Sequence, residues 1–457
     1  MTISVAPQPN LQWTDAGGGV DLAQLIVPRD HADPDGETIS LFVARHRATD
    51  PKRRIGTLLV NPGGPGAAGS VLAEQAGKVY SKRLLERFDV VGWDPRGVGR
   101  SIPAVDCVDD LDPVFSLDIT PDSAADEQAL TEQAAAFVAG CTARSGGVLP
   151  FVSTEQSARD IESLRVALGE DRVSYFGFSY GSELGATWLT LFPTSVRAAV
   201  LDGSIDPRQS AVDESLQQAT GFERALDGFL AHCAADKKCE FYNDGNPQQA
   251  FVELMATLDA SPIVTSKSRV PVTSGVASIA VAQAMYASTV WPRLERALAD
   301  AVRGRGDGLL ALYDGYLGRD GDGVYDNTLE AFFATTCLDG DATAADRDVL
   351  SRRLAEVAPR MGGLWLEPDV CEGWPVPAPS RPTVTGAGAP PVVVVGTTGD
   401  PATPIEASKG MAEALESGIL VTVVGDEHTG YGLNDCIDNV VDGYLIDLAV
   451  PAVGTTC

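Results

Sequence analysis

The sequence contains few positive charges, few histidines and no long apolar run. Lys and Arg number 34 against 63 Asp and Glu, which gives a formal net charge of −29. This acidity repels nucleic-acid phosphates and anionic lipid headgroups, so we expect neither nucleic acid nor a membrane surface as a partner. No run of about 18 apolar residues occurs, which argues against a transmembrane helix. The first ten residues lack a basic stretch followed by an apolar one, so no signal peptide is expected within them.

Metal-binding cysteine patterns are also absent. The chain has eight cysteines, but none forms a CxxC motif or a Cys/His cluster, so no zinc site is expected. An even number of cysteines without metal spacing favours disulfides and an oxidising location, either secreted or in the cell envelope. Free buried thiols in a cytoplasmic protein are the alternative. The cysteines are spaced like four neighbouring pairs: Cys107 and Cys141, Cys233 and Cys239, Cys337 and Cys371, and Cys436 and Cys457.

Short apolar runs alternate with helical patterns in the first 205 residues. A chain of 457 residues with 44% apolar residues exceeds one ordinary domain of about 100–200 residues, so it holds two domains or one core with an insertion. Strands alternating with helices predict a mostly parallel sheet flanked by helices. Strands are expected at 39–48, 55–61, 88–94, 173–179 and 196–203, and helices at 71–88, 156–169 and 182–193.

This alternation stops after about residue 206 and returns near the end of the chain. Ala-rich helical segments follow from 211 to 360, and a Pro-rich linker spans 374–391. The α/β pattern then resumes with a strand at 391–396, a helix at 404–416 and a strand at 419–425. We therefore predict a core built from residues 1–205 and 376–457, with a mainly helical lid inserted at 206–375.

The pentapeptide Gly177-Phe-Ser179-Tyr-Gly181 lies between a predicted strand and a predicted helix. A G-x-S-x-G motif in this context is typical of a nucleophile elbow, a tight turn that exposes a serine hydroxyl at the carboxyl end of a sheet. Serine is a poor nucleophile at neutral pH and needs a base, usually a histidine held by a carboxylate. Ser179 is therefore the predicted nucleophile.

The sequence offers few candidates for the histidine base and for the acid that orients it. Of the four histidines, His428 follows the last predicted core strand, whereas His31, His46 and His232 are interpreted as structural or surface residues. Asp400 lies between serine and histidine in the chain and follows a core strand, so it is the favoured acid. Asp202, after the preceding strand, is the alternative.

Backbone N–H groups are expected to stabilise the oxyanion. One should come from Tyr180 and the other from Gly64, or alternatively Gly63, in the loop NPGGPG. The same loop also satisfies G-x-G-x-x-G at residues 64–69, and Asp94 ends the next strand, as in a Rossmann-type nucleotide-dependent oxidoreductase. That alternative leaves Ser179 and His428 without a role.

Several motifs together resemble one known family. NPGGPG, WDPRGVGRS (93–101), GFSYGSELGATW, GDPATP, and EHTGYG followed by a cysteine pair are similar to those of the tripeptidyl aminopeptidase group of actinobacterial α/β-hydrolases, which are related to proline iminopeptidases. The resemblance covers nearly the whole chain and is weakest in the lid. It implies an α/β-hydrolase fold and a serine exopeptidase that removes short peptides from free N-termini, with Ser179, Asp400 and His428 as its triad and no cofactor.

Some positions depart from the family pattern. Ser182 and Glu183 replace the more usual threonine-containing run, the glycine loop continues as AAGS, and a cysteine pair near residues 13–25 is missing. An esterase or amidase acting on a non-peptide compound is therefore the alternative function, and a catalytically silent binding protein is a more distant one. For an aminopeptidase, Glu183, Asp339 and Glu372 are the candidate carboxylates for the substrate amine. The expected partner is accordingly a peptide, or a small ester or amide.

Overall fold

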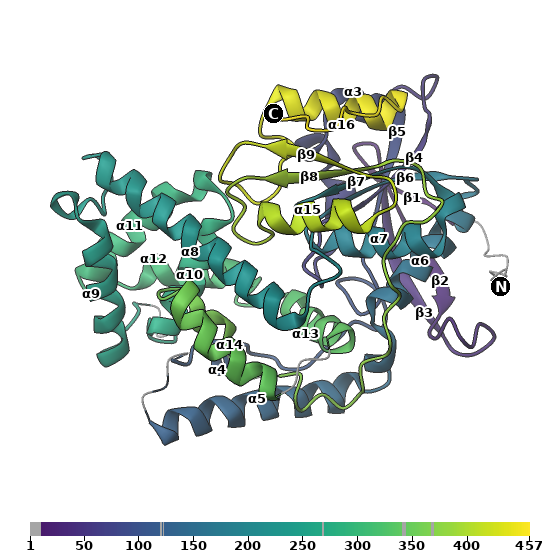
Figure 1. Ribbon diagram of the computed structural model, residues 1–457. Helices are drawn as coiled ribbons and strands as arrows, with labels where there is room; N and C mark the ends of the chain where they lie inside the picture. Colours follow the sequence, from purple (N-terminus) through teal and green to yellow (C-terminus); the bar gives the residue numbers. More distant parts are fainter. Residues whose placement is uncertain (1–10, 119–120, 122, 267–268, 341–343, 367–369) are drawn as a thin grey trace.

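The protein is built around one large β-sheet (Figure 1). The computed structural model describes residues 11–118, 121, 123–266, 269–340, 344–366 and 370–457. Within these residues nine strands form one sheet in the order β1-β2-β3-β5-β4-β6-β7-β8-β9. The pairs β1–β2, β2–β3 and β3–β5 are antiparallel, whereas all pairs from β5 to β9 are parallel. The strands are β1 (Thr14–Gly17), β2 (Val20–Pro28), β3 (Thr38–His46), β4 (Gly56–Asn61), β5 (Phe88–Trp93), β6 (Val173–Phe178), β7 (Val196–Asp202), β8 (Val392–Thr397) and β9 (Gly418–Val423).

Both faces of the parallel part are buried, which explains its continuous apolar strands. Along β4, Leu59 packs into one hydrophobic cluster, whereas Leu58 and Val60 pack into the other. The predicted mostly parallel sheet flanked by helices is confirmed. One face is covered by α6 (Thr154–Leu168), α7 (Tyr180–Leu191) and α15 (Ile405–Ala414), and the other by α1 (Ser70–Glu74), α2 (Ala76–Val79), α3 (Lys82–Arg87) and α16 (Asp435–Asp447) (Figure 1).

The expected single helix at 71–88 is divided into α1, α2 and α3. Tyr80 has an extended backbone, and Ser81 caps α3 by accepting a hydrogen bond from the backbone N–H of Leu84. The ring of Tyr80 lies 5.9 Å from that of Phe176, so it packs into the core under β6. The break therefore allows Tyr80 to pack into the core. The helical spacing of the apolar residues in 71–88 did not predict this break.

The inserted region is helical, as predicted, and has its own hydrophobic core. This core also contains side chains from residues 105–152, among them Leu111 and Phe137, so a segment that precedes β6 belongs to the lid packing. Figure 1 places α5 beside the lid helices. The helices in this region are α4 (Asp112–Phe115), α5 (Ala124–Ser145), α8 (Ala211–Ala235), α9 (Pro247–Ala260), α10 (Ser274–Met285), α11 (Trp291–Val302), α12 (Asp307–Tyr316), α13 (Thr328–Asp339) and α14 (Ala344–Val357).

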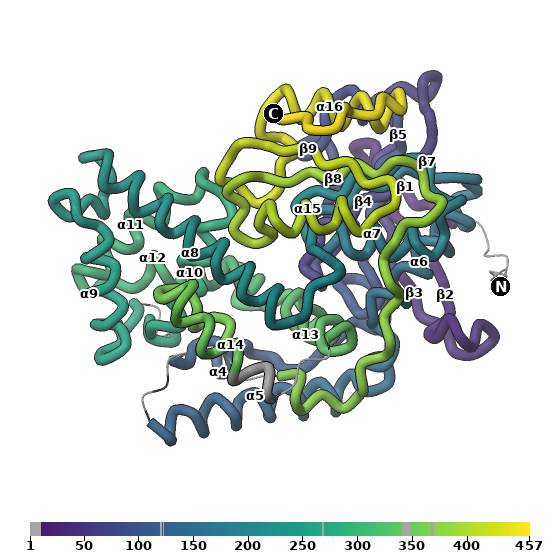
Figure 2. Tube along the Cα trace, in the orientation of Figure 1, coloured from purple at the N-terminus to yellow at the C-terminus, as the bar shows by residue number. Residues whose placement is uncertain are grey.

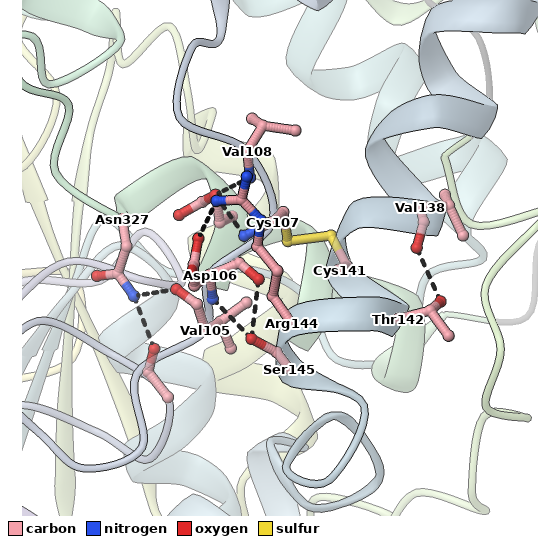
Figure 3. The surroundings of a disulfide bond; sticks show 12 residues. Val105, Asp106, Cys107, Val108, Val138, Cys141, Thr142, Arg144, Ser145 and Asn327 are labelled. Carbon is pink, nitrogen blue, oxygen red and sulfur yellow. Dashed lines mark hydrogen bonds and ion pairs between the residues drawn. A yellow bond between two sulfur atoms is a disulfide. The ribbon is translucent and has the colours of Figure 1, made fainter.

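The start of α13 is fastened to the loop after β5. The Asn327 side chain donates to the carbonyls of Gly97 and Val105, at 2.9 Å each (Figure 3). The Glu330 carboxylate accepts from the backbone N–H groups of Cys107 and Val108, beside the Cys107–Cys141 disulfide. The start of α13 is therefore bonded both to Gly97 in the loop after β5 and to the segment 105–152 that packs with the lid.

Four disulfides join the cysteines that are neighbours in the sequence. They are Cys107–Cys141, Cys233–Cys239, Cys337–Cys371 and Cys436–Cys457. The expectation of disulfides is confirmed, and such a set is typical of proteins in oxidising compartments. No helix among the described residues is both long and apolar enough to cross a membrane.

The Pro-rich segment between lid and core has no helix or strand from residue 376 to residue 390. Figure 2 follows it from the lid back to β8. The Thr190 hydroxyl in α7 accepts from the backbone N–H groups of Thr385 and Gly386, and Arg381 reaches the start of α7 through an ion pair with Glu183. The linker is thus held against the helix that follows Ser179.

Candidate active site

Ser179 lies in a sharp turn between β6 and α7, at the carboxyl edge of the sheet. Its φ is 55° and its ψ −128°, a strained conformation for a residue other than glycine. Glycine is required on both sides of this turn because a side chain would have no room there. A Cβ on Gly177 would lie 2.2 Å from the carbonyl oxygen of Gly181, and a Cβ on Gly181 would lie 2.8 Å from that of Asn61. The turn has the form of a nucleophile elbow.

His428 and Asp400 lie on the loops after β9 and β8 and contact each other directly. The His428 Nδ1 is 2.9 Å from Oδ1 and 3.0 Å from Oδ2 of Asp400, which is 3% exposed. Backbone N–H groups of Ala402, Thr403 and Thr429 also donate to this carboxylate. An Nδ1–H donated to Asp400 leaves Nε2 of the imidazole available as a base.

Asp202 connects the serine turn with the histidine loop. The backbone N–H of Ser179 donates to the Asp202 carbonyl at 2.8 Å. The Asp202 carboxylate accepts from the backbone N–H groups of Gly430 and Tyr431, at 2.8 Å each. The structure therefore brings Ser179, His428 and both candidate acids to one edge of the sheet, and the acid bonded to the imidazole is Asp400.

The buried surroundings shift the pKa values of Asp202 and His428. Burial raises the pKa of Asp202 to about 7, although hydrogen bonds from Tyr431 and Gly430 favour its charged form. Burial disfavours the charged imidazolium of His428, but the charge and hydrogen bond of Asp400 outweigh this and raise its pKa above the ordinary value. A histidine with this environment is suited to accept a proton from a serine hydroxyl.

The glycine loop lies directly against the serine turn. A Cβ on Gly63 would lie 2.6 Å from the carbonyl oxygen of Phe178 and 3.0 Å from the backbone nitrogen of Tyr180, and its φ is +97°. Only glycine allows this approach. The Gly63 N–H already donates to the Asn61 side chain at 2.9 Å, which favours Gly64 over Gly63 as the second oxyanion donor.

Two of the three candidate amine-binding acids lie next to the serine turn. The Asp339 carboxylate, at the end of α13, accepts from the backbone N–H and the hydroxyl of Thr154, and the hydroxyls of Thr154 and Tyr180 are bonded to each other. Burial raises the pKa of Asp339 to about 6. The Glu183 carboxylate is paired with Arg381, whose guanidinium also donates to the Asp339 carbonyl.

Glu372 and the other histidines lie apart from this arrangement. Glu372 is exposed beside the Cys337–Cys371 disulfide. The His31 imidazole is bonded to Asp160, which also binds the buried Arg96. His46 lies in β3, and the His232 Nε2 is 3.6 Å from Glu295 in the lid.

Thr403 and Tyr286 contact the candidate base and were not predicted. The Thr403 hydroxyl donates to Asp400 at 3.0 Å and lies 3.3 Å from the His428 Nδ1. The ring of Tyr286 meets the imidazole edge to face, with centroids 5.4 Å apart. A threonine three residues after Asp400 in a turn was a usable signal, since such hydroxyls often bond locally. Nothing in the sequence pattern of the lid singles out Tyr286.

Comparisons with known proteins identify the family of this chain. The family model described as alpha/beta hydrolase fold matches residues 56–246, and the one described as TAP-like protein matches residues 358–457. The serine protease Hip1 of Mycobacterium tuberculosis is 37% identical, over 96% of this chain and 88% of the relative. Carboxylesterase B of the same organism is 38% identical over 95% and 86%, and the tripeptidyl aminopeptidase of Streptomyces coelicolor 31% over 99% and 86%. This chain belongs to the TAP-like family of α/β-hydrolases.

As a TAP-like α/β-hydrolase, the protein is a serine hydrolase, which confirms the fold, the family and the enzyme class expected from the sequence. Membership argues against the dinucleotide-binding alternative, and so do the local contacts. The Asp94 carboxylate is fully buried and accepts from the backbone N–H groups of Ser70 and Arg100, so it is not placed to bind a ribose. A Cβ on Gly66 would lie 2.2 Å from the Thr328 carbonyl, because α13 covers this part of the glycine loop.

Proposed function

We propose that this serine hydrolase is an aminopeptidase that releases short peptides from free N-termini, with Ser179, His428 and Asp400 as its triad. The observation that carries the proposal is the Asp400–His428 hydrogen bond, at the same edge of the sheet as a serine in a strained strand-to-helix turn. A serine base that is already oriented by a buried carboxylate needs little rearrangement before attack. Similarity to the Streptomyces coelicolor tripeptidyl aminopeptidase supports peptides as the substrate class.

The proposed reaction has two acyl-transfer steps. His428 accepts the Ser179 proton as the hydroxyl oxygen attacks the scissile carbonyl, and the imidazolium then protonates the leaving amine as the C–N bond breaks. Water, deprotonated by His428, hydrolyses the acyl-enzyme and regenerates the serine. Asp400 holds the imidazole tautomer throughout, and the N–H groups of Tyr180 and Gly64 bind the oxyanion.

The free amine of the substrate requires a carboxylate near the serine. Asp339 and Glu183 are the candidates supported by position, since both lie against the first turn of α7. Glu372 is exposed on the lid and is the weaker candidate. If Asp339 binds the amine, Asp339→Asn raises KM for a tripeptide amide and leaves hydrolysis of p-nitrophenyl acetate, which has no amine, nearly unchanged. Glu372→Gln is measured in parallel, and a raised KM in that variant alone would assign the amine to Glu372.

The proposal is tested with tri-alanyl and mono-alanyl p-nitroanilides against p-nitrophenyl esters, using wild type and Ser179→Ala. The expected result is cleavage of the tripeptidyl amide by wild type, blocked by N-acetylation of the peptide and lost in Ser179→Ala. Efficient cleavage of the acetylated peptide would contradict an aminopeptidase. Unchanged activity of Ser179→Ala would contradict the assigned nucleophile.

An esterase or amidase for a non-peptide compound is the second candidate. It is supported by similarity to carboxylesterase B and by the ion pair of Glu183 with Arg381, which engages one of the acids that an amine would need. Cleavage of p-nitrophenyl esters without cleavage of either anilide would favour this function.

An oxidising location, secreted or in the cell envelope, is part of the proposal and is supported by the four disulfides. Thiol alkylation of the protein isolated from its native cells tests it. Eight protected cysteines are expected, whereas rapid alkylation before reduction would indicate a reducing compartment.

A further inference from the structure

A short segment of the lid lies directly against the loop that carries His428. Tyr286 and Ala287 connect α10 with the 3-10 helix η4 (Ser288–Val290), which precedes α11. The backbone N–H of His428 donates to the Tyr286 carbonyl at 3.0 Å. The Tyr286 ring packs against the imidazole on one side and against Phe222 of α8 on another. The histidine loop is thus in contact with the interior of the lid.

Backbone hydrogen bonds hold the histidine loop from two directions. From the core, Asp400 accepts from the N–H of Thr429, and Asp202 accepts from those of Gly430 and Tyr431. From the lid, the Tyr286 carbonyl accepts from the N–H of His428 itself. Four consecutive N–H groups therefore have acceptors, and the one on the histidine depends on the position of the lid.

Glu427 strengthens the contact on the lid side. One of its carboxylate oxygens accepts from the backbone N–H of Ser288 at 2.9 Å, and the other accepts from the Ser288 hydroxyl. Both oxygens are thus used to bind the residue that begins η4. Hydrogen bonds to a charged acceptor are stronger than bonds between neutral groups. These two hydrogen bonds can therefore fix the distance between the lid and the histidine loop.

We propose that Glu427 is a positioning residue, which holds the His428 loop to the lid through Ser288 and thereby keeps the imidazole in register with Ser179. This inference rests on the proposed function, because it assumes that His428 is the base. Small displacements of a catalytic group cost large factors in rate, so a loosened loop lowers kcat even when substrate binding is retained. It also assigns the lid a role in assembling the site.

The test compares Glu427→Ala, Glu427→Gln and Ser288→Ala with the charge-matched control Asp426→Asn. Asp426 is exposed and precedes Glu427 in the same loop. Glu427→Ala should lower kcat on tri-alanyl p-nitroanilide, and the rate of Ser179 labelling by a fluorophosphonate, by about tenfold or more, with KM changed by less than about twofold. Glu427→Gln keeps one carbonyl acceptor and should be intermediate, and Asp426→Asn should resemble wild type.

A double-mutant cycle separates positioning from other roles. Because the two side chains act through one contact, Glu427→Ala/Ser288→Ala should lose little more activity than Glu427→Ala. Equal loss in Asp426→Asn would attribute the effect to charge, and a higher KM at unchanged kcat would mean that Glu427 binds substrate. Either result, or full additivity, would overturn the inference. The inference would also be overturned if the unfolding temperature of Glu427→Ala fell so far that unfolded protein alone explained the lost activity.

Failure of the proposed function is recognised in the wild-type protein. If the fluorophosphonate does not label Ser179 there, the function and this inference fall together. If it labels Ser179 in wild type and labels Glu427→Ala equally fast, only the positioning role is wrong.

Discussion

At the residue scale, the two buried aspartates at the histidine loop have different partners, although Asp202 ends β7 and Asp400 follows the neighbouring parallel strand β8. Asp400 is hydrogen-bonded to the side chain of His428, whereas Asp202 accepts from the backbone N–H groups of Gly430 and Tyr431. An acid bonded to the imidazole controls the tautomer and stabilises the imidazolium that forms during attack. An acid bonded to the backbone shapes the loop.

This difference predicts unequal effects on catalysis. Asp400→Asn should lower kcat by about 10⁴-fold, because the amide favours the wrong imidazole tautomer. Asp202→Asn should lower it far less, since an amide oxygen still accepts from one of the two N–H groups. Steady-state kinetics on tri-alanyl p-nitroanilide measures both. A larger loss in Asp202→Asn than in Asp400→Asn would reverse the assignment of the acid.

The raised pKa of Asp202 predicts a pH dependence of stability. Burial raises this pKa in the folded state to about 7 from an ordinary value of 3.8, so the folded protein binds the proton more tightly than the unfolded chain. The stability that results is complete below about pH 4 and is lost as pH rises through 7. Urea unfolding between pH 5 and 8 should therefore show a smaller loss of stability with rising pH in Asp202→Asn than in wild type. Parallel pH profiles for the two proteins would exclude this role.

The sequence alone nominates a candidate triad, because a tight turn, a scarce histidine and an acid after a strand each leave a local signature. Ser179, His428 and Asp400 were named from such signatures, and the structure brings His428 and Asp400 into contact. Tyr286 and Arg381 reach the site only through tertiary packing of the lid and the linker. Their spacing along the chain carries no information about that contact.

At the element scale, the glycine loop is enclosed between the serine turn and the lid. Gly63 faces the turn, whereas Gly66 lies under α13, where an added Cβ would be 2.2 Å from the Thr328 carbonyl and 2.9 Å from the Phe332 nitrogen. The loop therefore links the candidate oxyanion hole to a lid helix. The Thr328 carbonyl and the Phe332 nitrogen both belong to α13, so neither can make room for a side chain at residue 66 unless the helix moves.

Gly66→Ala should consequently displace α13 from the loop and lower both activity and thermal stability. Its φ of +94° adds strain for any L-residue with a side chain, so a cost of about 1–3 kcal/mol is expected before the steric clash is counted. Gly77→Ala is the control, because a Cβ there would meet nothing within 4 Å. Thermal unfolding and kcat/KM measure the effect. Equal stability of the two variants would show that α13 does not restrain this loop.

The core elements were more predictable than the lid elements for a physical reason. Strands such as β8 are buried on both faces and appear as uninterrupted apolar runs, whose class is evident without knowing their neighbours. The participation of residues 105–152 in the lid packing depends on long-range contacts such as those of Glu330 with Cys107 and Val108. No periodicity within either segment encodes such a pairing.

At the scale of the whole molecule, the lid has its own hydrophobic core but also contacts the Asp400 loop, the His428 loop and the glycine loop. The Gln218 side chain of α8 donates to the Ala402 carbonyl beside Asp400, Glu427 is bound by Ser288, and α13 covers Gly66. Asp339 is joined to Tyr180 through Thr154. Loss of lid structure should therefore disable catalysis, not merely broaden the choice of substrate.

Three of the four disulfides lie in the lid cluster, which makes its stability sensitive to reduction. Cys107–Cys141 and Cys337–Cys371 each span 34 residues, and closing a loop of that size stabilises by about 3–4 kcal/mol in the chain-entropy model. With dithiothreitol, the lid should unfold at a lower urea concentration than the sheet. Activity should disappear with the lid, while strands β4 to β8 stay protected.

Hydrogen exchange measured by mass spectrometry along a urea series, with and without reductant, distinguishes the two regions. The expected pattern is early exchange in α8 to α13, coincident with loss of anilide hydrolysis, and late exchange in β6 and β7. The matched control is Cys436→Ser/Cys457→Ser in the absence of reductant. This disulfide joins α16 of the core to the last residue of the sequence, so its removal leaves the three lid disulfides in place. If hydrolysis persists after the lid peptides have exchanged, the triad is organised by the core alone, and the contacts of Ser288 and Gln218 are not needed for catalysis.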